Sequence, residues 1–415
     1  MRESIFRPEG LGYVCEFPEI RTTFHVDRLR VSSGDMKGHV MVKTALKGAR
    51  TYADGVLHYS QENLSSSTSR KSLGGTLEKK VPSDPPIDWF GMYDEFCTMV
   101  MLADRAGSPP DVVGDLADTG VHRLLFNPLV PLGVHSILFG DGGLGKSILA
   151  IAASVSIQTG REIIEGFVPE ETGPVLYLNW ETSKEDIDQR VKAVCKGAGI
   201  KPVTMYHVYG NGRPLAQRVE AVARIVDQTG AVMLVVDSSG KAIGTSGEGP
   251  IEDAANRFAS ALDEIGRTTL CIDHVSKAGA QTHGGAGKPY GSTMKTNWAR
   301  ATWELTQASE PDDAGAHLVL HHRKHNTTSE HSPIGLRMIW EDGSVRWEQE
   351  AVNPSALAYG GTLVERIEAT LAGHPLRPME IAQRIGSKDN IVRAVLSSNK
   401  ERFTRLDSGD WMTVD

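Results

Sequence analysis

The chain has 415 residues, a length that predicts two to four domains at roughly 100–200 residues per domain. Hydrophobic residues make up 40% and charged residues 23% of it, which is the composition of a soluble globular protein with an apolar core. The net charge of −8 excludes a generally basic nucleic-acid binder, so any contact with nucleic acid must come from local patches or from an assembled ring. No apolar run approaches the roughly 20 residues that a membrane span requires.

The sequence shows neither a targeting signal nor a disulfide framework. Its start, MRESIFRPEG, has neither the apolar core nor the cleavage site of a signal peptide. The four cysteines lie far apart and form no CxxC pair, which argues against a zinc site. We therefore expect reduced thiols and a cytoplasmic location.

Residues 1–121 predict an N-terminal α+β module. Alternating runs such as HVMVKTA indicate strands, and two helices are expected at 65–81 and 88–107. The first helix opens on serines able to cap it, and the second starts at Asp88 and stops at Gly107. The stretch GSPPDVVGDLADTG, residues 107–120, is the composition of a linker and marks a domain boundary.

Residues 122–350 predict an α/β domain built on a parallel sheet with helices on both faces. Short apolar runs at 136–140, 175–180, 204–209, 232–238 and 269–275 alternate with helical patterns at 147–160, 186–199 and 215–230. Two later runs, 316–322 and 336–340, follow closely and are typical of antiparallel additions. A second break at 350–362 precedes the C-terminal segment.

The stretch after the first of these strands is a nucleotide-binding loop. It fits GxxxxGK[ST] and lies between the strand SILF and a helix, where that motif must lie. Its backbone N–H groups at a helix N-terminus would hold phosphate oxygens, Lys146 would reach the β- and γ-phosphates, and Ser147 would bind Mg²⁺. The alternative is an ordinary glycine-rich turn. The predicted nucleotide-binding residues are Gly140, Asp141, Gly142, Gly143, Leu144, Gly145, Lys146, Ser147 and Ile148.

Three polar residues follow other strands of the predicted sheet. Asp237 ends the strand at 232–238 and suits contact with Mg²⁺; the alternative is a helix-capping Asp. Glu181 follows the strand at 175–180 and would polarise the attacking water; the alternative is a surface Glu that starts a helix. His274 would bond the γ-phosphate or its water, or else be a core histidine. The carboxyl ends of neighbouring parallel strands meet at one crevice, so we expect the three side chains to lie close together.

The glycine-rich stretch after His274 carries Lys277, Lys288 and Lys295 with one aromatic residue, Tyr290. A flexible basic loop at the carboxyl end of a strand suits contact with a DNA backbone. An ordinary surface loop has the same composition, so this alternative stays open.

The ordered set GDGGLGKS, YLNWE, LVVDS, DHVSK, GSTMKTNWAR and RKHN resembles the RecA-like hexameric ATPases of the plasmid RepA helicase type, related to DnaB-type replicative helicases. The resemblance covers about residues 122–350 and implies an AAA-family P-loop ATPase of bacterial or phage-related origin with a RecA-like core. The N-terminal residues resemble a module that accompanies such ATPases, with no activity implied.

The resemblance also implies roles for individual residues. It matches Lys146 and Ser147 to the Walker A pair, Glu181 to the catalytic glutamate, Asp237 to Walker B and His274 to the sensor. Arg300 takes the place of an arginine finger that enters a neighbouring subunit's nucleotide site, and Lys324 that of a basic residue near the same boundary. The alternatives are a structural salt bridge for Arg300 and a solvated strand end for Lys324 and Arg323.

Residues 362–415 resemble a winged helix-turn-helix, with helices expected at 363–373, 377–386 and 387–399 followed by two strands. Such a domain would present Ser387, Lys388, Asn390 and Arg393 to a DNA major groove. A winged helix that binds protein is the alternative, because the same helix carries Asp389 and is not strongly basic.

Taken together, the sequence predicts an ATP- and Mg²⁺-dependent motor that forms a homo-oligomeric, hexameric ring and translocates on single-stranded DNA, as a replicative-type helicase does. One alternative is a RecA- or KaiC-like ATPase that coats or remodels a partner without unwinding DNA. The other is a regulator that binds ATP as a ligand and DNA through the C-terminal domain.

Overall fold

The computed structural model describes residues 3–32, 34–107, 123–244, 251–275, 295, 297–308, 315–326, 331–352, 363–385 and 387–414. The chain divides into two compact units. The first is Met1–Asp118 with Glu220–Gln228, and the second is Thr119–Val219 with Thr229–Asp415. Each unit is described by itself.

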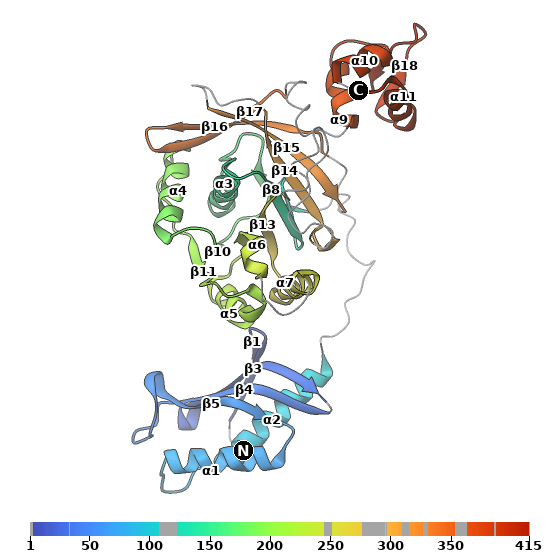
Figure 1. The fold of residues 1–415 in the computed structure, drawn as a ribbon. Helices are drawn as coiled ribbons and strands as arrows, with labels where there is room; N and C mark the ends of the chain where they lie inside the picture. Colours follow the sequence, from blue (N-terminus) through green and yellow to red (C-terminus); the bar gives the residue numbers. More distant parts are fainter. Residues whose placement is uncertain are drawn as a thin grey trace. The chain divides into compact units, whose positions relative to one another are not determined.

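The first unit contains a five-stranded antiparallel sheet in simple sequential order (Figure 1). Its strands are β1 (Ile5–Glu9), β2 (Gly12–Phe17), β3 (Thr22–Ser32), β4 (Asp35–Thr44) and β5 (Val56–Asn63), with short 3-10 turns η1 (Pro18–Ile20) and η2 (Ala53–Gly55). Buried and exposed residues alternate along β4, as expected for a strand with one covered face. Helices α1 (Ser67–Lys80) and α2 (Trp89–Ala106) pack with this sheet around Phe24, Tyr93 and Phe96.

Both helices start and end where the sequence predicts. The side chains of Ser66 and Asp88 accept hydrogen bonds from the first turns of α1 and α2, and Gly107 ends α2 with φ of 61°. Gly74 allows α1 to approach α2 closely, because a Cβ at this position would lie 2.8 Å from Phe90 Cα. The neighbouring Gly75 has no atom within 4 Å of its Cβ position.

These two glycines should therefore respond in opposite directions to the same substitution. Gly75→Ala should stabilise α1 by roughly 1 kcal/mol, because alanine favours the helix and meets no neighbour. Gly74→Ala should destabilise the α1–α2 pair by roughly 1–3 kcal/mol through steric overlap with Phe90. Amide hydrogen exchange of residues 67–106 in the full chain measures both effects, and equal protection in the two variants would contradict the close contact.

The second unit is built on a nine-stranded sheet of order β11-β10-β12-β13-β8-β14-β15-β16-β17. The first six are parallel: β11 (Tyr206–Tyr209), β10 (Val175–Asn179), β12 (Met233–Asp237), β13 (Thr268–His274), β8 (His135–Gly140) and β14 (Ala301–Gln307). The last three, β15 (Ala316–His325), β16 (Ile334–Glu341) and β17 (Ser344–Glu350), are antiparallel. This arrangement confirms the predicted α/β class with a large sheet that is parallel at its centre.

Helices cover the parallel strands, whose residues are buried without alternation in β8, β10 and β12. Val175, Tyr177 and Met233 pack with residues of α3 and α4, while intervening residues such as Leu176 and Leu234 are equally buried. Both faces of the sheet are therefore covered. The helices of this unit that precede the C-terminal segment are α3 (Lys146–Thr159), α4 (Lys184–Gly197), α6 (Ser239–Ile243) and α7 (Ile251–Ile265), and a small sheet contains β6 (Leu124–Asn127), β7 (Val130–Pro131) and β9 (Val168–Pro169). The remaining helix, α5 (Val219–Thr229), belongs to the first unit from Glu220 to Gln228.

The structure departs from the sequence reading at one helix and at two strands of the large sheet. The helix expected at 215–230 divides into the 3-10 turn η3 (Leu215–Gln217) and α5, with Arg218 between them at a non-helical φ of −130°. Strands β14 and β17 were not foreseen. Each is a strand because of its neighbours in the sheet. β14 pairs with β8, which is distant in the sequence, and β17 pairs with β16, to which a turn joins it.

The C-terminal segment has three helices, α9 (Leu363–Leu371), α10 (Pro378–Ile385) and α11 (Asp389–Ser398), followed by the antiparallel pair β18 (Phe403–Arg405) and β19 (Trp411–Thr413). They share a small apolar core that includes Ile367, Ile381, Val392 and Phe403. The element order is the predicted one. The assignment to winged helix domains remains a prediction, as do the domain boundaries drawn from the sequence.

All four cysteines, Cys15, Cys97, Cys195 and Cys271, are buried and free. Burial raises the pKa of Cys15 and Cys97 to about 12 and raises that of Cys271 further. The thiols of Cys15, Cys97 and Cys271 are therefore protonated near neutral pH. Among the helices of the described part of the chain, none combines the length and the apolar character that a bilayer span requires.

Candidate functional site

Four parallel strands end at one cavity of about 400 Å³ in the second unit. Strands β10, β12, β13 and β8 are consecutive neighbours in the sheet, so their carboxyl ends lie side by side. The cavity is lined by Gly143, Gly145, Lys146, Ser147, Ile148, Glu181, Thr182, Arg190, Asp237, Ile272 and His274. The structure thus brings together the candidates that the sequence placed after four separate strands, and adds Thr182, Arg190 and Ile272.

The loop between β8 and α3 has the geometry that a phosphate-binding loop needs. Gly145 is the N-cap of α3 in the left-handed region, with φ of 85°. The backbone angle favours glycine, and a Cβ there would lie 2.8 Å from Met338 Sδ, so the flexible end of the Met338 side chain would have to shift. The loop therefore delivers the free N–H groups of a helix N-terminus to the cavity.

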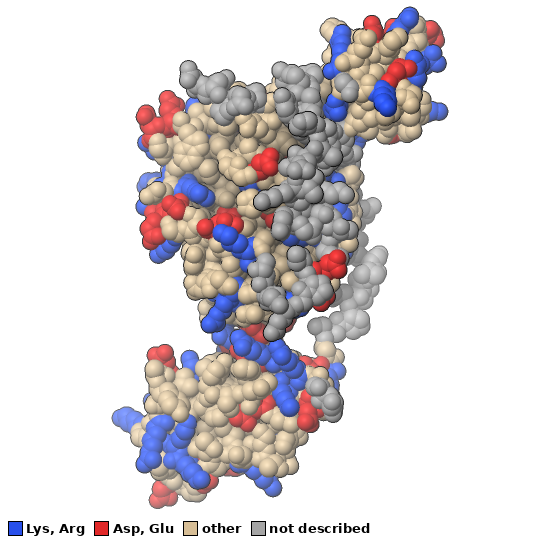
Figure 2. Space-filling model, viewed as in Figure 1, with Lys and Arg blue, Asp and Glu red and all other residues tan. Residues whose placement is uncertain are grey.

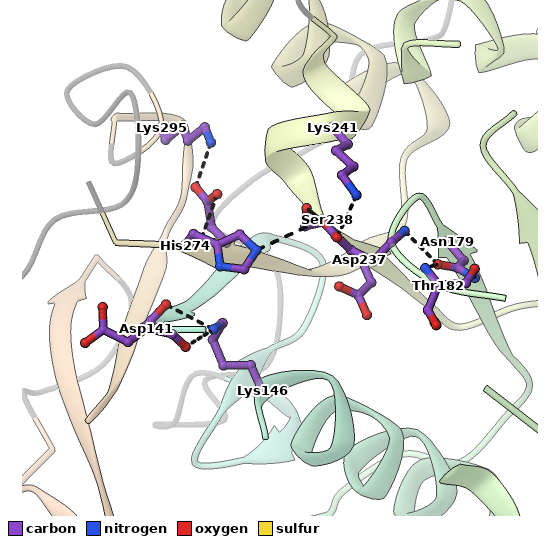
Figure 3. Close-up of polar contacts among 12 residues, drawn as sticks. Asp141, Lys146, Asn179, Thr182, Asp237, Ser238, Lys241, His274 and Lys295 are labelled. Atoms are coloured by element: carbon purple, nitrogen blue, oxygen red, sulfur yellow. Dashed lines mark hydrogen bonds and ion pairs between the residues drawn. The ribbon is translucent and has the colours of Figure 1, made fainter. Parts of the chain in front are cut away.

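Lys146 is held over this loop. Its side chain is buried, and Nζ donates hydrogen bonds to the carbonyl oxygens of Gly140 at 3.0 Å and Asp141 at 2.6 Å (Figure 3). Burial lowers the pKa of Lys146, and the carboxylates of Asp237 and Asp141 oppose that effect. The ammonium group is thus placed beside the loop that would receive phosphate oxygens.

Asp237 is a buried carboxylate at the tip of β12, with 1% of its surface exposed. The Tyr177 hydroxyl donates to its Oδ2 at 2.6 Å. Burial raises the pKa of Asp237, while hydrogen bonds from Tyr177 and Ser147 lower it in part. A serine hydroxyl next to a carboxylate supplies the hard oxygen atoms that Mg²⁺ prefers, so the residues present fit a magnesium ion. The described residues contain no cluster of three or more His, Cys, Asp or Glu that would hold a metal by itself.

Glu181 lines the same cavity as the loop and is fixed by its neighbours. The Ser238 hydroxyl donates to Oε1, and Lys241 Nζ donates to Oε2 at 2.8 Å (Figure 3). Its backbone N–H donates to the Oδ1 atom of the buried Asn179 at 2.9 Å. Partial burial raises the pKa of Glu181, but the hydrogen bonds from Lys241 and Ser238 outweigh it and lower the pKa overall. Glu181 is therefore ionised near neutral pH. Sequence reasoning missed Lys241, although the string DSSGK places it within one helical turn of Ser238.

His274 ends β13 and faces Glu181, with Nε2 lying 4.0 Å from Glu181 Oε1. Half of its side chain is exposed, so the alternative of a core histidine is wrong. Its backbone N–H donates to Asp273 Oδ1 at 3.0 Å, and Asp273 in turn pairs with Lys295 at 2.7 Å. Both charged side chains of this pair are almost fully buried, which fixes the backbone at the point where His274 begins.

Two basic side chains that the sequence placed at the surface are buried. Lys295, read as part of the basic loop, has 4% of its side chain exposed and is bound to Asp273. Arg323, for which a solvated strand end was the alternative, has 7% of its side chain exposed and donates from Nε to Glu304 Oε2 at 2.7 Å. Neither position is available to a DNA backbone. Lys277, Lys288 and Tyr290 lie outside the described residues.

Arg300 lies away from the cavity of its own chain. Its backbone N–H donates to the carbonyl oxygen of His135 at 2.9 Å, at the start of β8, whereas the phosphate-binding loop begins at Gly140 at the other end of that strand. Lys324 Nζ donates to the Ala299 carbonyl oxygen at 2.7 Å. The structure therefore brings Arg300 and Lys324 together at the edge opposite the cavity, with the Arg300 side chain exposed.

On α11, Lys388 occupies the N-cap position, and Arg393 pairs with Asp389 at 2.7 Å, one turn earlier. The Arg393 side chain is 59% exposed, so its charge is accessible but partly balanced. The DNA-binding role of both residues remains a prediction.

Comparison with known proteins supports the coarse assignment. Residues 105–280 match the model of a family described as an AAA domain, which supports a P-loop ATPase. No curated protein matches the sequence. Among solved structures, the chain is similar to a KaiC-like protein from the hyperthermophilic archaeon Pyrococcus horikoshii OT3, with 15% identity and a TM-score of 0.37 over 54% of this chain and 93% of that chain. The matched family segment ends before Arg300 and Lys324, so the roles of these two residues stay predictions.

Removing one member of the buried Asp273–Lys295 pair should destabilise the strand that carries His274. Lys295→Met leaves an uncompensated buried carboxylate and should cost roughly 3–5 kcal/mol. The double variant Asp273→Asn with Lys295→Met removes both charges and should recover most of that loss. Hydrogen exchange of residues 268–274 across a urea series measures both variants, and a double variant no more stable than the single one would contradict the pairing.

Proposed function

We propose that the protein is an ATP-dependent, ring-forming DNA motor, a replicative-type helicase that hydrolyses ATP to translocate on single-stranded DNA. One observation carries the proposal. Lys146, Glu181, Asp237 and His274 converge on one cavity, while Arg300 and Lys324 lie together at the opposite edge of the sheet. Both positions are explained if the cavity of one subunit binds the nucleotide and Arg300 and Lys324 of a neighbouring subunit complete that site.

In this mechanism the chain's own residues bind the phosphates, orient the attacking water and neutralise the charge of the transition state. The loop N–H groups and Lys146 bind the phosphates. Ser147 and Asp237 would hold a magnesium ion, which would neutralise phosphate charge. Glu181 orients a water molecule whose oxygen attacks the γ-phosphorus; ADP leaves, and the carboxylate accepts the proton. His274 contacts the transferred phosphate from the adjacent strand, and the exposed Arg300 stabilises the transition state in the next subunit.

A second candidate is a RecA- or KaiC-like ATPase that remodels a partner without unwinding DNA. The charge distribution favours it. On the face that Figure 2 shows, the described Lys and Arg side chains of the second unit are interspersed with Asp and Glu rather than gathered into one basic band. Arg393 is also paired with Asp389. An ATP-binding regulator that contacts DNA through α11 is the third reading.

Substitution of Glu181 separates a motor from a regulator. Glu181→Gln removes the proton acceptor but keeps the size of the side chain, so ATP hydrolysis should fall by about 100-fold or more while MgATP binding persists. Lys146→Ala should weaken binding itself. Steady-state ATPase assays with and without single-stranded DNA, beside nucleotide-binding measurements, give the result. Undiminished turnover in Glu181→Gln would remove Glu181 from the chemistry, and ATPase activity without unwinding of a forked duplex would favour the remodeller.

Mixing two inactive variants tests whether Arg300 acts in a neighbouring subunit. Arg300→Ala keeps Glu181, and Glu181→Gln keeps Arg300, so each should be inactive alone. Co-assembled subunits should regain part of the ATPase activity at interfaces that combine an intact Glu181 with an intact neighbouring Arg300. The assembly mass is recorded in parallel. An Arg300→Ala protein that assembles and hydrolyses ATP normally would contradict the assignment.

A further inference from the structure

A second cavity of about 460 Å³ adjoins the phosphate-binding cavity and is not used by the mechanism above. One wall is the outer side of α4, with Gln189, Arg190 and Lys196, and the other is the β16–β17 hairpin, with Trp340 and Gly343. Arg190 lines both cavities. The two spaces are therefore neighbours that share one side chain.

The walls of this cavity are held in place by close backbone contacts. A Cβ on Gly197, at the end of α4, would lie 1.9 Å from the Val345 carbonyl oxygen, so helix and hairpin touch directly. Lys196 Nζ donates a hydrogen bond to the Asp342 carbonyl oxygen. Asp342 and Gly343 have φ of 48° and 69°, the two-residue turn that makes a tight, twisted hairpin. Figure 1 shows this hairpin beside α4. Trp340 is thus presented by a fixed hairpin.

The hairpin also reaches the phosphate-binding loop. Met338 lies two residues before Trp340 on the same face of β16, and its Sδ is 2.8 Å from the Cβ position of Gly145. At the usual rise of a strand, Trp340 lies about 7 Å along β16 from Met338. The hairpin that carries Trp340 therefore also contacts the phosphate-binding loop, and the cavity beside Trp340 shares Arg190 with the phosphate-binding cavity.

The chemistry of the cavity suits a flat, aromatic ligand. Trp340 is 51% exposed, an unusual position for the largest aromatic side chain, and it lines a cavity together with Arg190. Aromatic rings and guanidinium planes both stack on nucleobases. Lys196 and Gln189 add hydrogen-bond donors at the rim.

We infer that this cavity binds the base of the nucleotide whose phosphates occupy the adjoining loop, with Trp340 as the stacking surface. The inference rests on the proposed nucleotide-binding function and extends it from the phosphates to the nucleoside. Trp340 is then a specificity-determining residue. It lies about 195 residues after Gly145 of the phosphate-binding loop.

The test compares ATP with inorganic tripolyphosphate, which has the phosphates but no base. In the full-length protein with Mg²⁺, Trp340→Ala should weaken ATP binding by about tenfold or more and leave tripolyphosphate binding unchanged. Trp340→Phe, which keeps an aromatic face, should recover most of the ATP affinity. Tyr206→Ala is the matched control, because Tyr206 is an equally exposed aromatic residue (49%) on β11 that lines neither cavity.

The outcomes separate this inference from the proposed function. Equal weakening of both ligands would mean that Trp340 acts through the phosphate-binding loop, and unchanged affinity for both would mean that the base lies elsewhere; either result overturns the inference. A Trp340→Ala protein with altered assembly mass and normal ATP affinity also overturns it, in favour of a subunit contact. A wild-type protein that binds neither ligand would instead refute the proposed function.

Discussion

The in-register pairing of strands β10, β12, β13 and β8 is the constraint on which the candidate site depends. Asn179 lies opposite Asp237, Asp237 opposite Ile272, and His274 opposite Gly140. Because these pairings are parallel, residues that follow the strands emerge at one edge and face one another. The distances within the site follow from backbone hydrogen bonds rather than from the side chains themselves.

Buried charge is concentrated at that same edge. Lys146, Asp237, Asp273 and Lys295 are each at most 5% exposed. Burying such groups is unfavourable unless each finds a partner, and here the partners are carbonyl oxygens, the Tyr177 hydroxyl or an opposite charge. The site is thus both the chemically active part of the sheet and the part whose stability depends most on complete hydrogen bonding.

Local signals in the sequence predicted the elements that form by local rules. The ends of α2 follow from Asp88 and Gly107, and the phosphate-binding loop follows from its glycines and the apolar strand before it. The candidates after β10, β12 and β13 were found because parallel strands share an edge. Lys241, Arg190 and Trp340 were not found, because their positions depend on packing between segments far apart in the chain. The same limit explains why Lys295 looked like a loop residue: its carboxylate partner is 22 positions away.

The four buried cysteines have a practical consequence. Alkylating reagents attack thiolates. All four thiols are shielded, and burial holds those of Cys15, Cys97 and Cys271 in the protonated form, so they should react slowly in the folded chain. A single cysteine introduced at an exposed position would then be the preferred attachment point for a fluorophore or spin label. The natural chain is therefore suited to site-specific labelling without prior replacement of its own cysteines.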